Sequence, residues 1–324
     1  MKRIAIIWIA IAAVIAGSPA RAADTYPLKP VRLLTPYSAG GNADIQARYM
    51  AEKLGEMLGK QFIVDNRPGA NGIIGMETVA RSAPDGYTLM LIANTFTVNP
   101  SLYKNIPFDT VKDFQPISLV GETPLLLIAH PSVAAGNVKE LLALAKAKPG
   151  QLNFGSSGNG SPAHMAGALL ETMTGVKLVH VPYKGMAAAI VDVMSGQIQL
   201  SFPSMTSVLP QVKAGKVKAY AITISKRSAL APNIPTMSEA GVPGYEASIW
   251  NGILAPAATP RPIVNRLHDA IVQILKTPQA AERYANVGAE IRYSTPEELH
   301  ALIKSDMAKW AKVIKAANIR MDQP

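Results

Sequence analysis

Short apolar stretches, glycine-rich turns and amphipathic segments follow one another along this chain in a repeated order. Val31–Thr35 is a short apolar run, and the next six residues, 36–41, have the composition of a turn. Apolar residues then recur at helical spacing at Ile45, Met50, Leu54 and Leu58. Residues 62–64 and 87–93 predict further strands, each separated from its neighbours by such turns and helices. This alternation predicts a parallel sheet with helices on both faces.

The same order begins again after residue 125. Segments typical of strands lie at 125–129, 152–154, 179–181, 198–202 and 217–223, and segments typical of helices lie at 138–146, after Pro162 and up to Gly196. A strand predicted at 249–254 returns to the first half, and helices are predicted to begin at Pro262, Pro278 and Pro296. Capping-box spacing occurs at Thr236 and Glu239 and at Thr295 and Glu298. We therefore expect an α/β chain with two lobes, each holding one mostly parallel sheet flanked by helices.

The first 22 residues have the pattern of a cleaved secretory signal. Lys2 and Arg3 precede thirteen apolar residues, and Ala20-Arg21-Ala22 matches an Ala-x-Ala cleavage site. An apolar core of that length is short for a bilayer, which needs roughly 20 residues. The sequence thus predicts a mature chain that starts at Ala23 and is released into the periplasm.

Length, cysteine content and charge narrow the classes of partner. The mature chain has 302 residues, which favours two domains because single cores stop growing near ~250–300 residues. The sequence holds no cysteine, so neither a lipid anchor on cysteine nor a disulfide is expected. Loss of the signal lowers the formal net charge from +10 to +7. The basic residues are scattered singly, so we expect anionic solutes rather than nucleic acid as partners.

Four turns follow predicted strands and lead into helices, at 36–44, 66–72, 155–161 and 182–185. Ligands of open α/β sheets bind outside the carboxyl ends of the strands, where helix starts offer free N–H groups to an anion. Structural interpretations stand beside this one: Asp44 supports its helix end, Arg67 makes an ion pair, and His164 is a packed or capping residue. The 155–161 loop lacks the Gly-x-Ser-x-Gly pattern of a nucleophile elbow, and the histidines lack zinc spacing. We therefore predict a protein that is not an enzyme and needs no metal or cofactor.

Several motifs together resemble those of a known family. They include Pro36-Tyr37-Ser38-Ala39-Gly40-Gly41-Asn42-Ala43-Asp44, Asn66-Arg67-Pro68-Gly69-Ala70-Asn71-Gly72, Asp85-Gly86-Tyr87, Gly155-Ser156-Ser157-Gly158 with Ser161 and His164, Tyr183-Lys184-Gly185 and Glu239-Ala240-Gly241. In these motifs, over residues 26–319, the chain resembles the tripartite tricarboxylate transporter receptor family, also called Bug proteins.

That resemblance implies a bilobal, type II-like periplasmic binding fold that closes on its ligand about a hinge. The first lobe would comprise residues 23–124 and 246–324, and the second residues 125–245. It implies a small carboxylate ligand, such as a di- or tricarboxylate or an aromatic acid. Many relatives carry an Asp within the segment equivalent to 199–203; its absence here favours a carboxylate without an ammonium group. The implied ligand-binding residues are Tyr37, Ser38, Gly40, Gly41, Asn42, Ser156, Ser157, Gly158, Ser161, His164, Tyr183, Lys184 and Gly185.

The expected partners follow from the same resemblance. A monomeric receptor would deliver its carboxylate to the membrane permease subunits of a tripartite transporter. The alternative is a periplasmic sensing subunit that presents its liganded form to a membrane signalling kinase. Both functions use the same inter-lobe site, so the sequence leaves both open.

Overall fold

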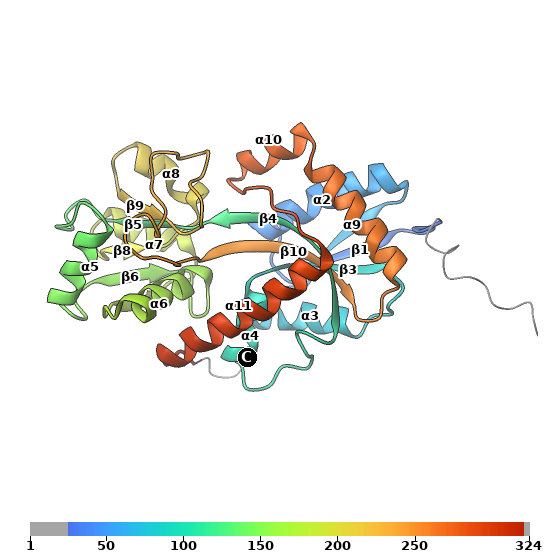
Figure 1. The fold of residues 1–324 in the computed structure, drawn as a ribbon, viewed down its shortest axis with the longest axis horizontal. Helices are drawn as coiled ribbons and strands as arrows, with labels where there is room; N and C mark the ends of the chain where they lie inside the picture. Colours follow the sequence, from blue (N-terminus) through green and yellow to red (C-terminus); the bar gives the residue numbers. More distant parts are fainter. Residues whose placement is uncertain (1–24, 321–324) are drawn as a thin grey trace, which may run out of the picture.

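The structure is a computed structural model that describes residues 25–320. The predicted signal segment, 1–22, lies outside the described residues. Two five-stranded sheets lie side by side along the long axis of the molecule, each flanked by helices (Figure 1). The predicted α/β bilobal architecture is confirmed. Within residues 25–320, no helix combines the length and the apolar character needed to cross a membrane.

The first sheet has the strand order β2-β1-β3-β10-β4. Its strands are β1 (Val31–Thr35), β2 (Phe62–Asn66), β3 (Thr88–Ala93), β4 (Phe114–Pro124) and β10 (Ser248–Pro256). β1 pairs in parallel with β2 and β3, whereas β10 lies antiparallel between β3 and β4. The sheet is therefore mixed rather than mostly parallel, because the strand that returns from the other lobe is inserted in the opposite direction.

The second sheet repeats this plan with the order β7-β6-β8-β5-β9. Its strands are β5 (Leu126–Ala129), β6 (Asn153–Ser156), β7 (Val179–Pro182), β8 (Leu200–Ser201) and β9 (Lys218–Ile222). β6 is parallel to β7 and β8, and β5 is antiparallel to β8 and β9. β6 thus holds the position in this sheet that β1 holds in the first.

Alternating side chains of each sheet face two helical layers. In the first lobe, Leu33 packs in a cluster with α2 (Asn42–Leu58), α9 (Arg261–Leu275) and α10 (Pro278–Asn286). Leu34, the next residue, faces α3 (Ile73–Ala80), α4 (Thr95–Leu102) and α11 (Pro296–Ala316). The second sheet packs α7 (Met186–Met194) and α8 (Met205–Lys213) on one face, and α5 (Val138–Ala147) and α6 (Pro162–Thr174) on the other. A short 3-10 turn at Ala70–Gly72 precedes α3.

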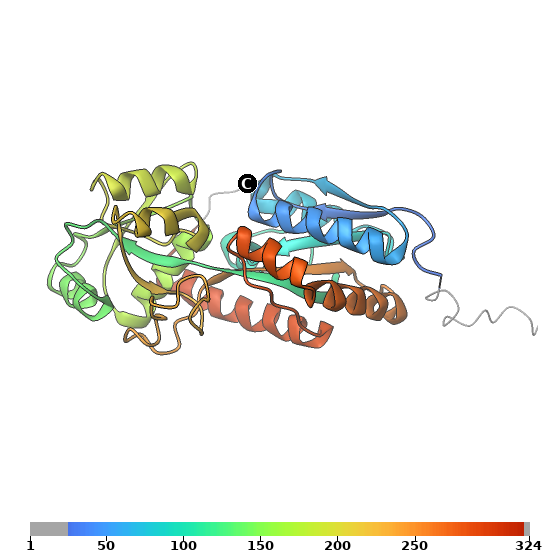
Figure 2. The same ribbon diagram turned by 90° about the horizontal axis from the view of Figure 1, so that it is seen from above.

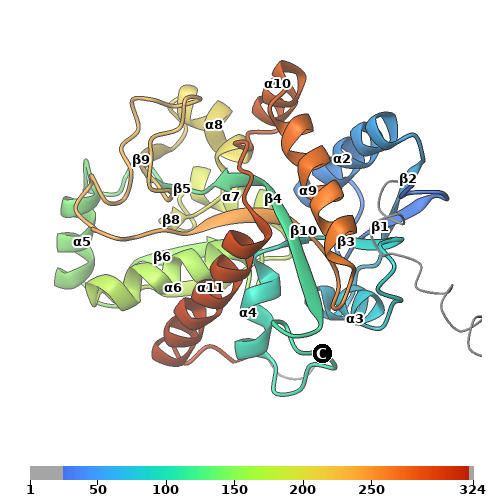
Figure 3. The same ribbon diagram turned by 45° about the vertical axis from the view of Figure 1, so that its right-hand side comes forward.

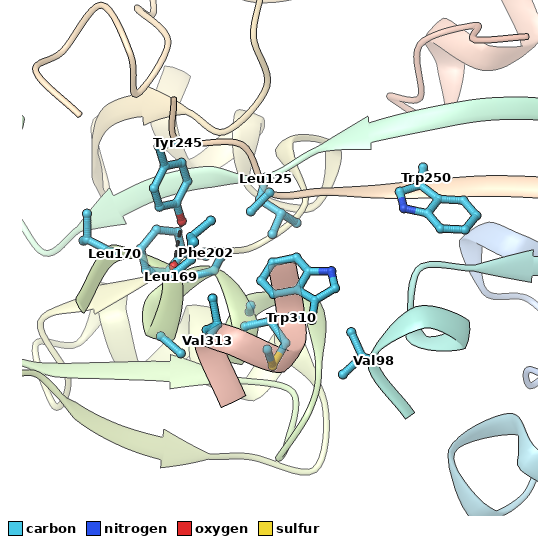
Figure 4. Close-up of a cluster of buried hydrophobic side chains, with 14 of the residues drawn as sticks. Val98, Leu125, Leu169, Leu170, Phe202, Tyr245, Trp250, Trp310 and Val313 are labelled. Atoms are coloured by element: carbon cyan, nitrogen blue, oxygen red, sulfur yellow. Dashed lines mark hydrogen bonds between the residues drawn. The ribbon is translucent and has the colours of Figure 1, made fainter. Parts of the chain in front are cut away.

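One apolar cluster continues from the first lobe into the second, and α11 lies across the junction (Figures 2 and 3). Figure 4 shows Trp310 and Val313 of α11 beside Leu169 and Leu170 of α6. The α11 carboxylate of Asp306 accepts hydrogen bonds from Thr97 Oγ1 at 2.8 Å and from Trp250 Nε1 at 3.1 Å. α11 is therefore fixed to the first lobe by Asp306 and packs against the second lobe through its C-terminal half.

Four elements differ from the sequence prediction, and one of them is the helix α8, which has Pro210 inside it and was not predicted. The strand β4 and the helix α4 were not predicted, because Pro116, Gly121 and Pro124 interrupt the first and Pro100 lies within the second. Thr236 and Glu239 make the two reciprocal hydrogen bonds of a capping box, but they close a turn and no helix follows. The capping box of Thr295 and Glu298 does begin a helix, as predicted.

Candidate ligand-binding site

The first group of predicted residues forms the turn between β1 and α2. Ser38, Gly40 and Gly41 are exposed there, and Gly40 has a φ of +81°, which glycine adopts without steric cost. No side chain caps α2 at Gly41. Because the first amides of a helix have no intrahelical acceptor, this turn presents backbone donors at the positive end of the helix dipole.

Tyr37 fixes the turn to the end of the neighbouring strand β3. Its hydroxyl accepts a hydrogen bond from the Ala93 backbone N–H at 2.9 Å and lies 2.7 Å from Thr95 Oγ1. Burial raises the pKa of this hydroxyl to about 12, against the opposing effect of these hydrogen bonds. The hydroxyl therefore stays protonated and hydrogen-bonded within the protein, and only the half-buried ring remains for contact with a solute.

Asp44 supports the turn from beneath, as its structural interpretation predicted. Its carboxylate is buried and accepts hydrogen bonds from the Gly40 N–H at 2.8 Å, Asn66 Nδ2 at 2.9 Å and Arg48 Nε at 2.9 Å. Burial alone raises the pKa of this carboxyl, but the hydrogen bonds from Arg48, Gly40 and Asn66 outweigh it, so the pKa is lowered. The ionised carboxylate is thus paired and fully engaged by the protein. Arg67 likewise makes the predicted ion pair, with Asp65 at 3.2 Å.

Asn42 directs its side chain away from the exposed turn. Its Nδ2 donates to Thr123 Oγ1 on β4 at 2.8 Å, and its Oδ1 accepts from Gln46 Nε2 at 2.5 Å. The side chain is therefore committed to the sheet, which leaves the Asn42 backbone N–H as the group that a ligand could use.

The second group forms the loop between β6 and α6. Ser157 is exposed, whereas Ser156 is fully buried and its Oγ lies 2.6 Å from His180 Nε2 and 3.0 Å from the Gly158 carbonyl. Ser156 therefore supports the loop instead of contacting a solute. The same burial denies it the role of a nucleophile despite its histidine neighbour.

The two lobes build their turns in the same way. In the first lobe, Gly40 donates its N–H to the side chain four residues later, Asp44. In the second, the Gly160 N–H donates to His164 Nδ1 at 3.0 Å, again four residues later, and Gly160 has a φ of +71°. The acceptor is a paired carboxylate in one lobe and a neutral ring in the other, so neither turn places an unpaired negative charge beneath its helix start.

His164 is packed, as its structural interpretation predicted. Its ring stacks on His180 with centroids 3.7 Å apart and planes 4° from parallel. Burial lowers the pKa of His164 to about 3, with a further contribution from His180, and burial lowers the pKa of His180 to about 4. Both rings are neutral at physiological pH. The start of α6 therefore offers Ser161 and backbone groups, without a histidine charge.

The loop that follows β7 lies against the β6–α6 loop. The Tyr183 N–H donates to the Ser156 carbonyl at 3.0 Å, and the Tyr183 hydroxyl donates to Asp192 Oδ2 at 2.7 Å. Burial and this carboxylate raise the pKa of the Tyr183 hydroxyl to about 12. Lys184 is exposed, and Gly185 begins α7 without a side-chain cap. The second lobe thus brings the starts of α6 and α7 together.

The structure also adds residues that the sequence reasoning missed. Thr95 and Asn94 follow the carboxyl end of β3, a position at which ligand-binding residues of such sheets are expected. A Cβ built on Gly160 would lie 2.5 Å from Leu102 Cδ1, so the loop of the second lobe contacts the end of α4 in the first. Among residues 25–320 no group of three or more His, Asp or Glu residues has the arrangement of a metal site.

Comparison with known proteins gives a consistent result. The model of the "Tripartite tricarboxylate transporter family receptor" matches residues 46–319. Protein BugT of Bordetella pertussis is 35% identical over 99% of this chain and 98% of its own length. The solved periplasmic binding protein BugD is 38% identical with a TM-score of 0.74, over 91% of this chain and all of BugD.

Two similar structures contain a carboxylate. Rpa4515 of R. palustris with adipate is 33% identical with a TM-score of 0.78, over 91% of this chain and 100% of the other. MatC of Rhodopseudomonas palustris with bound malate is 29% identical with a TM-score of 0.73, over 89% and 100%.

Proposed function

The chain belongs to the tripartite tricarboxylate transporter receptor family, and from this premise we propose that it captures a small carboxylate between its two lobes for uptake by a tripartite transporter. The family consists of solute-binding proteins, not of enzymes. We propose that it acts in the periplasm, with the membrane subunits of the transporter as partners; the predicted signal segment and the family support this proposal. We keep the predicted lobe division, 23–124 with 246–324 and 125–245, as part of this proposal.

One observation carries the proposal: each lobe ends its first parallel strand in a glycine turn that leads to a helix start. Gly40 and Gly160 hold equivalent positions in these turns, and the charge of Asp44 below the first is already paired. The N–H groups of Gly40 and Gly160 are taken by Asp44 and His164, but the N–H groups that follow them in the first turn of each helix have no intrahelical acceptor. An anion at such a helix start gains hydrogen bonds of about 1.5–3 kcal/mol each from those groups. Two such turns, one per lobe, suit a ligand that carries polar oxygens at both ends.

The adipate and malate of the two similar structures support this ligand class. Both are dicarboxylates without an ammonium group, the class that segment 199–203 favours. We propose Ser38, Gly40 and Gly41 as the contacts of the first lobe and Ser157, Gly158, Ser161 and Gly185 as those of the second. Tyr37, Asn42, Ser156, His164 and Tyr183 hold these loops in place, and Lys184 is an exposed cation beside the second group.

Isothermal titration of the mature protein with adipate, malate and the uncharged diamide of adipate tests the proposal. A dicarboxylate should bind and the diamide should not. The variant Ser157→Trp fills the exposed loop and should raise Kd by more than about 100-fold, or about 2.7 kcal/mol. Ser238→Trp, at an exposed serine in the turn after β9, is the matched control. Equal binding by Ser157→Trp and wild type would remove this loop from the site.

A further inference from the structure

The chain passes between the lobes at two adjacent points, and the contacts on either side of them define the hinge. On the β4 side, Leu125 is bound to Thr223 of the second lobe, through its N–H to Oγ1 at 3.0 Å and through its carbonyl. On the β10 side, the Ala247 N–H donates to the Thr223 carbonyl at 2.9 Å. Thr223 is fully buried. Both crossing segments are therefore held by one residue of the second lobe.

Two residues before Leu125 and one residue after Ala247, the two segments are held by the first lobe. Thr123 Oγ1 accepts the hydrogen bond from Asn42 Nδ2, and the Ser248 carbonyl accepts one from Asn94 Nδ2 at 3.1 Å. Pro124 separates Thr123 from Leu125. On each strand, the hydrogen-bond partners therefore change from one lobe to the other within two residues. This change places the hinge at Pro124 and at the Ala247–Ser248 link.

The first-lobe contact on β4 comes from the start of α2, next to the proposed ligand turn. Asn42 is bound to Gln46, whose Nε2 also donates to Asn251 Oδ1 at 3.2 Å, and Asn251 Nδ2 donates to the Ile92 carbonyl at 3.1 Å. These amides thus connect the first two turns of α2 to both crossing strands, because Thr123 lies on β4 and Asn251 on β10.

The packing around this network is close and incompletely satisfied. Gln46 and Asn251 are about 1% exposed, and Gln46 Oε1 has no hydrogen-bond partner among the described residues. β4 approaches α2 so closely that a Cβ on Gly121 would lie 2.9 Å from that oxygen and 2.6 Å from Tyr284 Cε1. The register between β10 and β4 shifts directly after Asn251, between Asn251 and Gly252, and again between Ile253 and Leu254. A buried amide oxygen without a hydrogen-bond donor is destabilising, so a rearrangement of its neighbours that supplies a donor lowers the free energy. A two-state element requires such a second arrangement.

We infer that Asn42 and Thr123 couple the ligand turn to the hinge: the hydrogen bond between them ties the orientation of the α2 start to the position of the crossing strand. Asn42 is a positioning residue in this scheme, acting through Thr123 and not through a side-chain contact to the ligand. A ligand that fixes the α2 start then favours the strand position of the closed lobes. This inference rests on the proposed function for its biological meaning, but the hydrogen bonds that form the coupling are present without ligand.

Thr123→Val removes the hydroxyl at nearly constant shape and tests the coupling. Thr35→Val is the matched control, because Thr35 is a buried threonine of the same sheet whose Oγ1 has no partner among the described residues. Thr123→Ser restores a hydroxyl and should rescue the wild-type behaviour. Should the valine variant fail to fold, Thr123→Ala removes the same group without added bulk.

The primary readout is the distance between the lobes without ligand. The chain has no cysteine, so spin labels on Glu52→Cys and Lys146→Cys, exposed residues of α2 and α5, report this distance cleanly. We expect Thr123→Val to broaden the distance distribution and to speed amide exchange both at the α2 start and at residues 121–125, with Thr35→Val and Thr123→Ser unchanged. Identical distributions and exchange in Thr123→Val and Thr35→Val would overturn the inference.

Adipate serves as the probe in a second arm. If adipate narrows the wild-type distribution, its Kd should rise about 10-fold in Thr123→Val and stay constant in Thr35→Val; an equal Kd in both would also overturn the coupling. If adipate does not bind the wild type, that result counts against the proposed ligand class alone, and the ligand-free comparison decides on the coupling.

Discussion

The stacked pair His164 and His180 predicts a loss of stability in mild acid that can be worked out from the structure. The folded protein holds the pKa of His164 at about 3 and that of His180 at about 4, whereas a histidine in an unfolded chain titrates near ~6.5. Below pH 6.5 the unfolded state therefore binds more protons than the folded state, and folding stability rises with pH in that window. The penalty grows as pH falls from about 6.5 towards the folded pKa values and is absent above.

The magnitude follows from the linkage relation. One pKa unit corresponds to about 1.36 kcal/mol, so lowering pH from 7.5 to 5 costs about 2 kcal/mol for each ring and about 4 kcal/mol for the pair. Folded domains have only ~5–15 kcal/mol of stability, so this is a measurable fraction. Other titrating groups contribute as well, which makes a comparison with a variant necessary.

The variant His164→Asn/His180→Gln removes both titrations and keeps the hydrogen bonds. Asn Oδ1 can accept from the Gly160 N–H in place of Nδ1, and the Gln amide can reach Ser156 Oγ in place of Nε2. Urea denaturation at pH 7.5 and pH 5 gives the free energy of unfolding of both proteins. We expect the decrease for the wild type to exceed that for the variant by about 4 kcal/mol. A difference under about 1 kcal/mol would show that the rings are not held neutral by burial, and the reasoning would fail.

Two further predictions concern the packing that holds the lobes. Gly167→Ala should destabilise the protein by about 1–3 kcal/mol, because its Cβ would lie 2.2 Å from Phe154 Cε2 in the core; an unchanged urea midpoint would contradict this contact. Asp306→Ala leaves the buried Nε1 of Trp250 without an acceptor and removes one of the two acceptors of Thr97 Oγ1, so we expect a loss of about 1–3 kcal/mol in the free energy of unfolding, together with faster amide exchange in α11. Wild-type exchange in α11 would show that Asp306 does not fix this helix.

Much of the fold could be predicted because local signals and burial agree. Val31–Thr35 is a short, largely apolar run between turns, and its two faces meet two helical layers. β4 gave no such signal, because prolines and a glycine lie within it and because its partner β10 lies far from it in the sequence. α4 has a poor helix-forming sequence, with β-branched residues and Pro100, and it forms because α11 and the sheet bury it.

The turns that form the candidate site were predictable in position, but the contacts of their side chains were not. Glycine turns after strands indicate where backbone donors gather, and the structure has these turns at the predicted places. That Asn42 faces Thr123, 81 residues away, depends on the tertiary path of β4, which no local pattern contains. Likewise, the burial of Ser156 follows from its contact with His180 on the neighbouring strand β7. Spacing along the chain does not distinguish an exposed serine from a buried one in the same loop.

The most direct test of the central claim is the thermal unfolding of the mature protein with a panel of solutes. The panel includes adipate, malate, citrate, an aromatic acid, an acidic amino acid and the diamide of adipate. A ligand that binds only the folded state at 100 times its Kd stabilises it by about 2.7 kcal/mol. We expect a clear rise in Tm with at least one carboxylate and none with the diamide. A panel without any shift, from protein shown to be free of co-purified ligand, would contradict carboxylate capture between the lobes.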